Sequence, residues 1–335
     1  MADYRRSDCG LLALCVESSH ARGMGHLFRA LNLADGMRLR GWSSFVFLIN
    51  AHEPALALLA EHGHRYEVVG LDNGTDWEQE AIQRLGIRIW IDDRLNTDLG
   101  HGHAVKAAGV PWVTFDDRGP GAALADLNIA ALVFEEPASL PGRRVLQGPD
   151  YLILNPEIAR FQRVRKDVQS LVVTMGGSDT YGVTVEVVKK LAASGRRATI
   201  IVGPGFAHWT GLEAVLTPDF LVRCGVSSLI AEFSRHDLAI TGGGVTPFEA
   251  AASGLPCIVI ANEDFEVPVG KALEGLGVAR FAGHYAAVDW ASLDETMAVE
   301  PMSRAGLARI GLGGRERVLD AIGAFRDGDK WPRPQ

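Results

Sequence analysis

The sequence predicts an α/β protein made of two domains, each a doubly wound parallel sheet. Short continuous apolar runs alternate along the chain with longer segments of helical periodicity, which is the pattern of parallel strands that helices cover on both faces. The pattern restarts near residue 169, and 335 residues are enough for two domains of ordinary size. We therefore expect an N-terminal domain over 1–150, a C-terminal domain over 165–325 and a tail over 326–335.

The expected strands are the apolar runs themselves, and the turn residues agree with them. In the first half the runs are LLALCV, SSFVFLI, IRIWI, PWVTF and AALVF; in the second half they are SLVVTM, ATIIVG, DLAIT and PCIVIA. A helix over 26–40 ends before Gly41 and one over 183–194 ends before Gly195, glycine being a common residue after a helix. The proline- and charge-rich segment 148–169 is the predicted hinge between two Rossmann-like halves.

Composition argues against several classes of function. The net charge is −8 without a basic run, which disfavours nucleic acid or an anionic membrane as the main partner. No apolar run is long enough to span a bilayer, and the short one near the N-terminus lacks the cleavage site of a signal peptide. The four cysteines form no CxxC pair, so we expect reduced thiols in a cytoplasmic protein.

Polar residues follow three predicted strands of the first domain. LLALCV is followed by ESSHARGMGH, IRIWI by Asp92-Asp93-Arg94, and PWVTF by Asp116-Asp117-Arg118. The carboxyl ends of parallel strands meet at one edge of the sheet, and ligands of open α/β sheets bind there. A single Asp-Asp pair is often only a cap and a turn, but two such pairs on one edge favour a binding site.

The stretch GMGHLFR places a histidine in the first turn of a predicted helix. Gly23 and Gly25 permit a tight turn and a close approach to a ligand. The positive end of a helix favours a neutral imidazole, which leaves His26 available as a base, and Arg29 can lie on the same side one turn later. The alternative is a histidine that only bonds the backbone. A dinucleotide fingerprint would need a small residue in place of Phe28, and a Walker A loop would need GK[ST], which is absent.

Two glycine-rich loops follow strands of the second domain. SLVVTM runs into Gly176, Gly177 and Ser178, and DLAIT runs into Gly242, Gly243 and Gly244. After the second loop we expect Thr246 as N-cap, Pro247 as the first helical residue and Glu249 completing a capping box. Capping alone accounts for Pro247 and Glu249 but not for the glycine run. A glycine-rich turn before a helix N-terminus suits a diphosphate, so phosphate binding is favoured.

The motif HGH occurs twice, at 62–64 and 101–103. Imidazoles two residues apart can share one face of a strand, which would suit a metal ion. Neither motif has a convincing set of further acidic or cysteine ligands beside it in the sequence. We therefore predict surface turns and no metal site.

Several motifs, taken in order, resemble one family of nucleotide-sugar enzymes. GMGHLFR resembles the GxGHxxR element of the hydrolases that remove UDP from UDP-2,4-diacetamido-2,4,6-trideoxy-altropyranose in pseudaminic acid synthesis, and that of the SpsG spore-coat polysaccharide family. It is more distantly similar to the MurG glycosyltransferases. The further elements are Ile91-Asp92, FDD at 115–117, GPDYLILNPEI at 148–158, VTMGGSD at 173–179 and AITGGGVTPFEAAASGLP at 239–256. The resemblance covers most of the chain, from about residue 11 to about residue 282, and implies a GT-B fold with two Rossmann-like domains facing across a cleft.

The resemblance also implies roles for individual residues. His26 would be the catalytic base. The implied sugar or acceptor pocket comprises Gly25, Arg29, Asp92, Asp116 and Asp117. The implied diphosphate site comprises Gly243, Gly244 and Thr246, with Gly176, Gly177 and Ser178 nearby, and the implied nucleoside contacts are Glu249 on the ribose and Asn262. Neither a metal nor a cofactor is implied, because glycine loops and helix N-termini neutralise the leaving diphosphate.

The sequence departs from the family's pattern near the expected sugar pocket. The family's R-x-D-A-S run is Val16-Glu17-Ser18-Ser19-His20 here, its Asp-x-Tyr is Asp92-Asp93-Arg94, and its Asn-Gln pair is Asn262-Glu263. These changes beside intact nucleotide loops indicate the same donor class with a different sugar or acceptor. We expect displacement at the anomeric carbon of a UDP-sugar, with water or a small hydroxyl compound as acceptor.

Three functions remain open on the sequence alone. Hydrolysis is favoured, because the long hydrophobic acceptor loop of a lipid-linked transferase is not evident. A GT-B glycosyltransferase that moves the sugar to a hydroxyl acceptor, in surface-polysaccharide or glycoprotein synthesis, is the first alternative. A non-catalytic nucleotide-sugar binding protein is the second, although a pure binder has no use for a base at His26. The sequence leaves the oligomeric state open.

Overall fold

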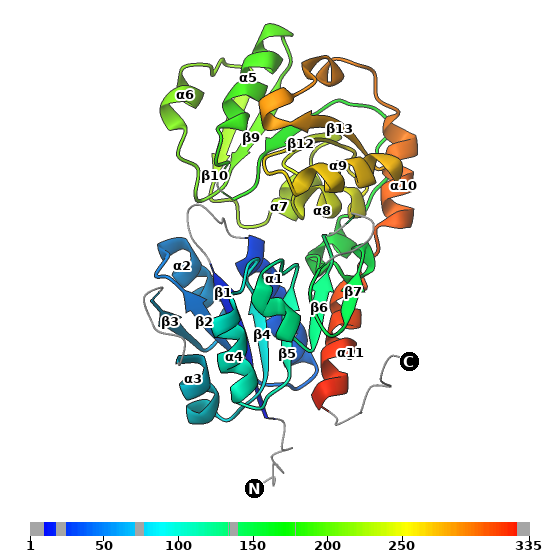
Figure 1. Ribbon diagram of the computed structural model, residues 1–335. Helices are drawn as coiled ribbons and strands as arrows, with labels where there is room; N and C mark the ends of the chain where they lie inside the picture. The colour runs from blue at the N-terminus through cyan, green and yellow to red at the C-terminus, as the bar shows by residue number, and fades with distance from the viewer. Residues whose placement is uncertain are drawn as a thin grey trace, which may run out of the picture.

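Two parallel sheets, each between layers of helices, make up the two lobes that Figure 1 shows one above the other. The structure is a computed structural model that describes residues 10–17, 25–70, 77–132, 134, 140–177 and 179–326. The first lobe has a seven-stranded sheet of order β3-β2-β1-β4-β5-β6-β7, and the second has a six-stranded sheet of order β10-β9-β8-β11-β12-β13. In each sheet the strand order reverses beside the first strand, as in the doubly wound folds that the sequence predicts.

Alternate residues of the central strand β1 belong to two different cores of the first lobe. Leu12, Leu14 and Val16 pack with α1, α2 and α11, whereas Ala13 and Cys15 pack with α3 and α4. Successive side chains of a strand point to opposite faces, so this strand is apolar throughout because both faces are covered. The strands are β1 (Leu11–Glu17), β2 (Ser44–Ile49), β3 (Tyr66–Val69), β4 (Ile87–Asp93), β5 (Trp112–Phe115), β6 (Leu127–Ala130) and β7 (Val145–Gln147). The helices are α1 (Gly25–Leu39), α2 (Glu53–His62), α3 (Trp77–Leu85) and α4 (Leu99–Ala107).

The second lobe repeats this plan around β8 and β11. Its strands are β8 (Leu171–Thr174), β9 (Ala198–Val202), β10 (Phe220–Cys224), β11 (Leu238–Thr241), β12 (Cys257–Ala261) and β13 (Ala279–His284). Its helices are α5 (Val183–Ala193), α6 (Trp209–Glu213), α7 (Leu229–Phe233), α8 (Thr246–Ala252), α9 (Glu266–Gly275) and α10 (Val299–Arg309). The glycines predicted to follow two helices are confirmed, because Gly41 and Gly195 take left-handed φ angles of 72° and 66° two residues after the last residues of α1 and α5.

One predicted strand is misplaced. The run AALVF was expected as a strand, but β6 is Leu127–Ala130 and residues 131 and 132 form a turn. Asn128 lies inside β6, where its amide donates to the backbone carbonyls of Asp117 and Pro141. The amide nitrogen of Asn128 thus has two backbone acceptors, and this polar side chain interrupts the apolar run without interrupting the strand.

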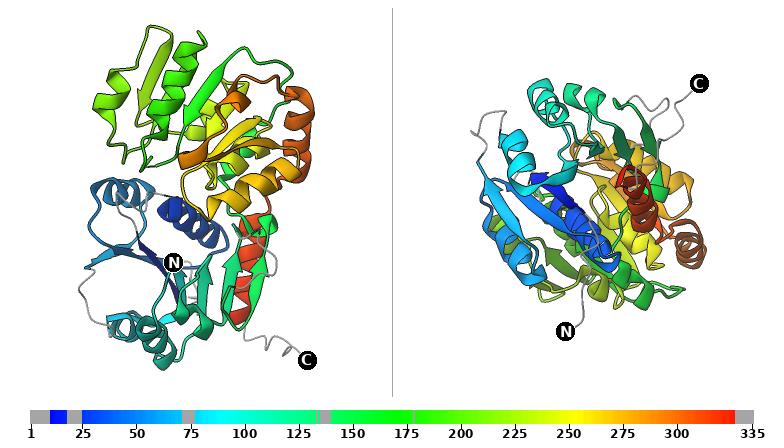
Figure 2. Two further views of the ribbon diagram at one scale, coloured as in Figure 1. Left: turned by 45° about the horizontal axis from the view of Figure 1, so that its top comes forward. Right: turned by 90° about the horizontal axis from the view of Figure 1, so that it is seen from below.

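The last helix packs on the first lobe although the sequence places it after the second. The predicted C-terminal domain of 165–325 contains almost all of α11 (Gly314–Arg326), yet Val318, Leu319 and Ile322 belong to the core of the first lobe. Figures 1 and 2 show this helix lying along the first sheet. The chain therefore crosses between the lobes twice, once in 148–169 and once between α10 and α11.

Candidate active site

The amino end of α1 brings a histidine and an arginine onto a carboxylate from β4. His26 and Arg29 lie one helical turn apart, and Asp93 is the last residue of β4, which neighbours β1 in the sheet. Nδ1 of His26 lies 2.6 Å from Oδ1 of Asp93, and Arg29 reaches both oxygens of that carboxylate at 2.7 and 2.5 Å. Arg29 and Asp93 are buried, whereas the His26 side chain is 17% exposed. A ligand can therefore reach the histidine but not the groups that hold it.

The charge state of Asp93 determines the tautomer of His26. Burial alone would raise the pKa of Asp93, but the charges and hydrogen bonds of Arg29 and His26 outweigh burial and lower that pKa to about 2. An ionised carboxylate can only accept hydrogen bonds, so Nδ1 of the neutral imidazole carries the proton and donates it. The lone pair is then on Nε2. An imidazole held in this way is suited to act as a general base.

Arg29 joins Asp93 to Asp116, the residue that follows β5. Nη1 of Arg29 lies 2.5 Å from Oδ2 of Asp116, and its guanidinium carbon lies 4.9 Å from the centroid of the Phe115 ring. Burial alone would lower the pKa of Arg29, but the two carboxylates outweigh burial and raise it. The other oxygen of Asp116 accepts the backbone N–H of Leu132. The network is thereby fixed to the carboxyl ends of two strands and to the segment after a third.

Asp92, which the resemblance assigns to the sugar pocket, lies on the opposite face of the sheet. Its Oδ2 accepts from the indoles of Trp90 and Trp112 at 3.1 and 2.6 Å and lies 2.7 Å from Nε2 of His101. Nδ1 of His101 lies 2.6 Å from Glu78. The structure therefore places Asp93 beside His26 and Asp92 in the interior. The predicted surface turn at the second HGH motif is also wrong, because His101 is buried within α4.

Asp117, like Asp92, has only interior hydrogen-bond partners. Its two oxygens accept the backbone N–H groups of Thr97 and Gly119 at 3.1 and 2.9 Å. They also accept the hydroxyls of Thr97 and Thr114 at 2.6 and 2.9 Å. The side chain is fully buried. Because these bonds come from inside the protein, Asp117 is not a ligand contact in this structure, contrary to the role that the resemblance implies.

A carboxylate occupies the backbone amides of the second glycine loop. Glu266, the first residue of α9, accepts the N–H of Gly243 at 3.2 Å and that of Asn262 at 2.7 Å. A Cβ on Gly243 would lie 2.7 Å from Cβ of Glu266, and a Cβ on Gly242 would lie 2.9 Å from Nδ2 of Asn262. Close packing thus explains two glycines that helix capping leaves unexplained. The loop nevertheless presents the N–H of Gly243 to an anion, here a protein carboxylate.

The predicted capping box at α8 is not formed. The helix begins at Thr246, and the residue before it, Val245, takes helical φ and ψ angles without any side-chain cap. Glu249 therefore does not complete a capping box. Burial raises the pKa of Glu249 to about 7, against the lowering effect of a hydrogen bond from the backbone of Asn155. Since Asn155 belongs to the segment 148–169, Glu249 contacts the connection between the lobes.

The first glycine loop is partly used by its own helix. Gly176 takes a φ of 88°, which favours glycine at that turn, and Gly177 follows it half-buried. Ser178 lies outside the described residues. The carboxylate of Asp179 accepts two N–H groups at the start of α5, at 2.8 and 2.9 Å. The N-terminal amides of α5 are therefore capped by the protein itself.

The network at His26 is physically connected to the second glycine loop. Leu132, whose N–H binds Asp116, is followed two residues later by Phe134. The ring of Phe134 stacks on that of Phe248 in α8, with centroids 5.9 Å apart and planes at 11°. Phe248 lies in the first turns of the helix that the glycine loop introduces. The carboxyl edge of the first sheet thus contacts the helix at the carboxyl edge of the second.

A cavity of about 460 Å³ lies elsewhere, at the amino ends of the strands of the second sheet. Lys166, Arg196, Leu238 and Glu295 are among its lining residues. This is the edge of the sheet opposite to the glycine loops, and ligands of open parallel sheets bind at the carboxyl ends of the strands, so the His26 site is favoured over this cavity.

Among the described residues, none of the helices combines the length and hydropathy needed to cross a membrane.

The sequence is distantly similar to two curated proteins, and no family model matches it. It is 23% identical over 278 residues to an uncharacterized protein of Methanocaldococcus jannaschii, covering 76% of this chain and 56% of that protein. It is 21% identical over 285 residues to the spore coat polysaccharide biosynthesis protein SpsG of Bacillus subtilis, covering 80% of this chain and 82% of SpsG. The chain is thus a distant homologue of SpsG, and it spans about half the length of the archaeal protein.

Several solved structures match almost the whole chain. MurG of Acinetobacter baumannii superposes with a TM-score of 0.67 at 14% identity, covering 94% of this chain and 99% of MurG. A glycosyltransferase of Rickettsia africae gives 0.64 at 11% identity, covering 96% and 100%. Anabaena HepE, solved in complex with UDP, gives 0.58 at 16% identity, covering 93% and 99%. These likenesses confirm the predicted GT-B fold.

Proposed function

We propose that this protein is an enzyme that displaces UDP from the anomeric carbon of a UDP-sugar, with His26 as general base and water as the favoured acceptor. The observation that carries this proposal is the contact of His26 with Asp93, a carboxylate that Arg29 also binds, at the accessible start of α1. A protein that only binds a nucleotide sugar has no need of a histidine whose tautomer a buried, ionised carboxylate fixes.

The chemistry follows from the protonation states. Nε2 of His26 takes a proton from water while the water oxygen forms a bond to the anomeric carbon. The bond from that carbon to the phosphate oxygen breaks, and UDP leaves with the electron pair. Asp93 stabilises the imidazolium that forms, through its contact with Nδ1 at 2.6 Å. Arg29 holds Asp93 ionised and in place, so it acts as a positioning residue.

The diphosphate binds at the second glycine loop, around Gly243, Gly244 and Thr246, with the first loop at Gly176 and Gly177 nearby. The amide of Gly243 already holds a carboxylate oxygen of Glu266, which supports anion binding at this position. A diphosphate that takes this amide has to displace that oxygen. Thr246 is half-buried at the first position of α8, so the N-terminus of that helix faces the same ligand.

The nucleoside contacts are Asn262 and Glu249. Oδ1 of Asn262 is buried and has no hydrogen-bond partner among the described residues. Such an acceptor is costly unless a ligand donates to it, which the N–H of a base or a ribose hydroxyl can do. The binding of UDP by HepE, a protein of the same fold, is consistent with a uridine nucleotide here.

The test is UDP release from a panel of UDP-amino and UDP-deoxy sugars without any acceptor, comparing the intact protein with His26→Gln. Release that depends on His26 supports hydrolysis and shows which sugar is preferred. A Gly243→Val variant should lose affinity for UDP, because a side chain there fills the anion position. If His26→Gln retains full turnover, the assigned base is wrong.

Transfer to a hydroxyl acceptor is the second candidate, and a similar structure favours it, since the Rickettsia protein is a glycosyltransferase by name. The same base would then deprotonate an acceptor hydroxyl. Tight UDP binding with no release in the panel would select transfer over hydrolysis. Release only after a hydroxyl acceptor is added would establish it.

A further inference from the structure

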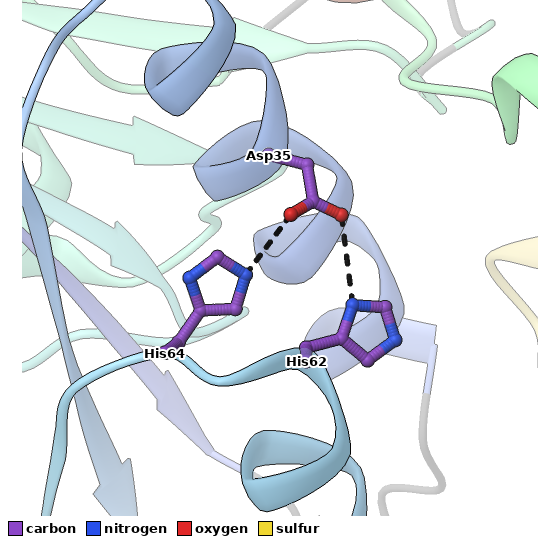
Figure 3. Close-up of side chains that lie close together, drawn as sticks. All are labelled: Asp35, His62 and His64. Atoms are coloured by element: carbon purple, nitrogen blue, oxygen red, sulfur yellow. Dashed lines mark ion pairs between the residues drawn. The ribbon is translucent and has the colours of Figure 1, made fainter.

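The structure brings the first HGH motif together with a carboxylate that lies far from it in the sequence. His62 is the last residue of α2, and His64 follows across Gly63, whose left-handed φ of 66° turns the chain at the end of the helix. Asp35 projects toward both imidazoles from α1, as Figure 3 shows. Nε2 of His64 lies 3.2 Å from one oxygen of Asp35, and Nδ1 of His62 lies 3.5 Å from the other. The three ligand atoms all lie within 4.8 Å of one another.

One nitrogen of this cluster has no hydrogen-bond partner. The His64 side chain is 7% exposed, and its Nε2 is buried without a hydrogen bond among the described residues, although it points at Asp35. A buried imidazole nitrogen that faces a carboxylate oxygen at 3.2 Å can share a cation with it.

The donor set selects the class of ligand. Two imidazole nitrogens and one carboxylate suit Zn²⁺ and related transition-metal ions, whereas Mg²⁺ and Ca²⁺ prefer oxygen ligands. A tetrahedral zinc site with bonds of about 2.0–2.1 Å has ligand atoms roughly 3.3 Å apart, and the two measured separations are 3.2 and 3.5 Å. His62 and Asp35 are 34% and 27% exposed, so an ion and a fourth ligand from water can enter. Nη2 of Arg38 also contacts Asp35 at 2.6 Å, but that side chain is 63% exposed and free to turn away.

We propose that Asp35, His62 and His64 bind a Zn²⁺ or related divalent transition-metal ion, which ties α1 to the turn between α2 and β3. The same helix carries His26 at its amino end. Asp35 lies nine positions further along, about 13 Å at the rise of an α-helix. The ion therefore takes no part in the chemistry at His26; it stabilises the helix on which His26 is mounted. This site is independent of the proposed function and goes beyond it.

The experiment titrates untagged, chelator-treated full-length protein with Zn²⁺ by calorimetry and with Co²⁺ by visible absorption, and it records the Tm with and without Zn²⁺. We expect one ion per chain, Co²⁺ bands of a four-coordinate site, and a rise in Tm with Zn²⁺ that Mg²⁺ at the same concentration does not give. Asp35→Asn and His64→Gln should abolish all of these effects. His103→Gln, which removes an exposed histidine from the surface of α4, is the matched control and should leave them unchanged.

Folding is checked by the circular dichroism of each stripped variant. Because His62 is one-third exposed, His62→Gln provides the same test with less risk to folding if the buried His64 position does not tolerate glutamine. No saturable binding by the intact protein overturns the proposal. Binding that persists in folded Asp35→Asn and His62→Gln also overturns it, because the ion must then sit elsewhere on the chain.

Discussion

Replacing Asp93 by asparagine tests the arrangement of the candidate site most directly. The amide keeps the shape of the side chain but removes the negative charge that holds Nδ1 of His26 protonated. An asparagine can present its N–H₂ group to Nδ1 and so favour the wrong tautomer, with the proton on Nε2. In the serine-protease triad the equivalent change costs on the order of 10⁴ in kcat. We expect a loss on the order of 10³ in kcat here, with little change in KM, because Asp93 contacts the base rather than the substrate.

The same variant has a stability cost that the structure lets us estimate. The pKa of Asp93 falls from 3.8 to about 2 in the folded protein. A shift of that size is worth roughly 2 kcal/mol, at about 1.4 kcal/mol per unit. A depressed pKa contributes stability above the unfolded value and loses it as the pH falls through the folded value. The difference in unfolding free energy between the intact protein and Asp93→Asn should therefore be about 2 kcal/mol at pH 7 and shrink between about pH 4 and pH 2.

Two measurements on the intact protein and Asp93→Asn test these predictions. Steady-state UDP release at pH 7 gives the loss in kcat, and urea unfolding at pH 7 and at pH 3 gives the loss in unfolding free energy. Asp117→Asn is the matched control, since Asp117 is a buried aspartate at the same edge whose bonds all go to Thr97, Thr114 and Gly119. That variant should lose stability and keep kcat. If folded Asp93→Asn retains kcat within twofold, the carboxylate does not orient the base and the proposed mechanism fails.

Further predictions concern the glycine loop, the interior of the first lobe and the lobe contact. Glu266→Gln should tighten UDP binding about tenfold, worth about 1.4 kcal/mol, because the variant removes a negative charge that competes with the diphosphate for the N–H of Gly243. Unchanged or weaker affinity for UDP in calorimetry would mean that the diphosphate binds elsewhere. His101→Gln should destabilise the fold without altering KM. Burial would lower the pKa of His101, but Asp92 and Glu78 raise that pKa to about 9. The charged imidazole therefore contributes fully to the unfolding free energy below about pH 6.5, and this contribution is lost as the pH rises through about 9. An equal loss of unfolding free energy in the variant at pH 6 and at pH 10, measured in urea, would refute this. Phe248→Ala should cost roughly 3–5 kcal/mol of unfolding free energy in thermal or urea unfolding, because its fully buried ring fills the core of the second lobe; a cost below about 1 kcal/mol would contradict that.

The strands that the sequence predicts are interior ones, and the strands it misses are the edges, apart from the interior strand β6, which it misplaces. β1, β2, β4 and β5, and β8, β9, β11 and β12, all follow from continuous apolar runs, because helices cover both of their faces. The strands without a predicted run are β3, β7, β10 and β13, which are the two edges of each sheet. β3 and β10 have mostly half-buried or exposed residues. Their sequences carry no continuous apolar signal, since only pairing with an interior neighbour makes them strands.

The sequence predicts that His26 and the two Asp-Asp pairs lie at one edge of the sheet, and it assigns Asp92 to the pocket, whereas the structure brings Asp93 beside His26. Strand alternation establishes that Asp92 and Asp93 face opposite ways, yet the sequence does not say which face α1 covers. That depends on the winding of the whole sheet. For the same reason the HGH motif at 62–64 offered no metal ligands in its own neighbourhood: Asp35 reaches it only through the packing of α1 beside α2.

The replacement of the family's Asp-x-Tyr by Asp92-Asp93-Arg94 can be understood from these two faces. Residues 92 and 94 share the interior face, where Asp92 and Glu78 surround His101, and Nη1 of Arg94 lies 3.4 Å from Nδ1 of His101. Burial would lower the pKa of Arg94, but nearby acidic groups, Asp92 and Glu78 among them, raise it. The arginine thus completes a buried charge network that helps to set the position of β4. Asp93, at the variable middle position, faces α1 and supplies the carboxylate that contacts His26. The departure from the family therefore changes both the support of the strand and the environment of the histidine. This is why we expect a related reaction on a different sugar or acceptor.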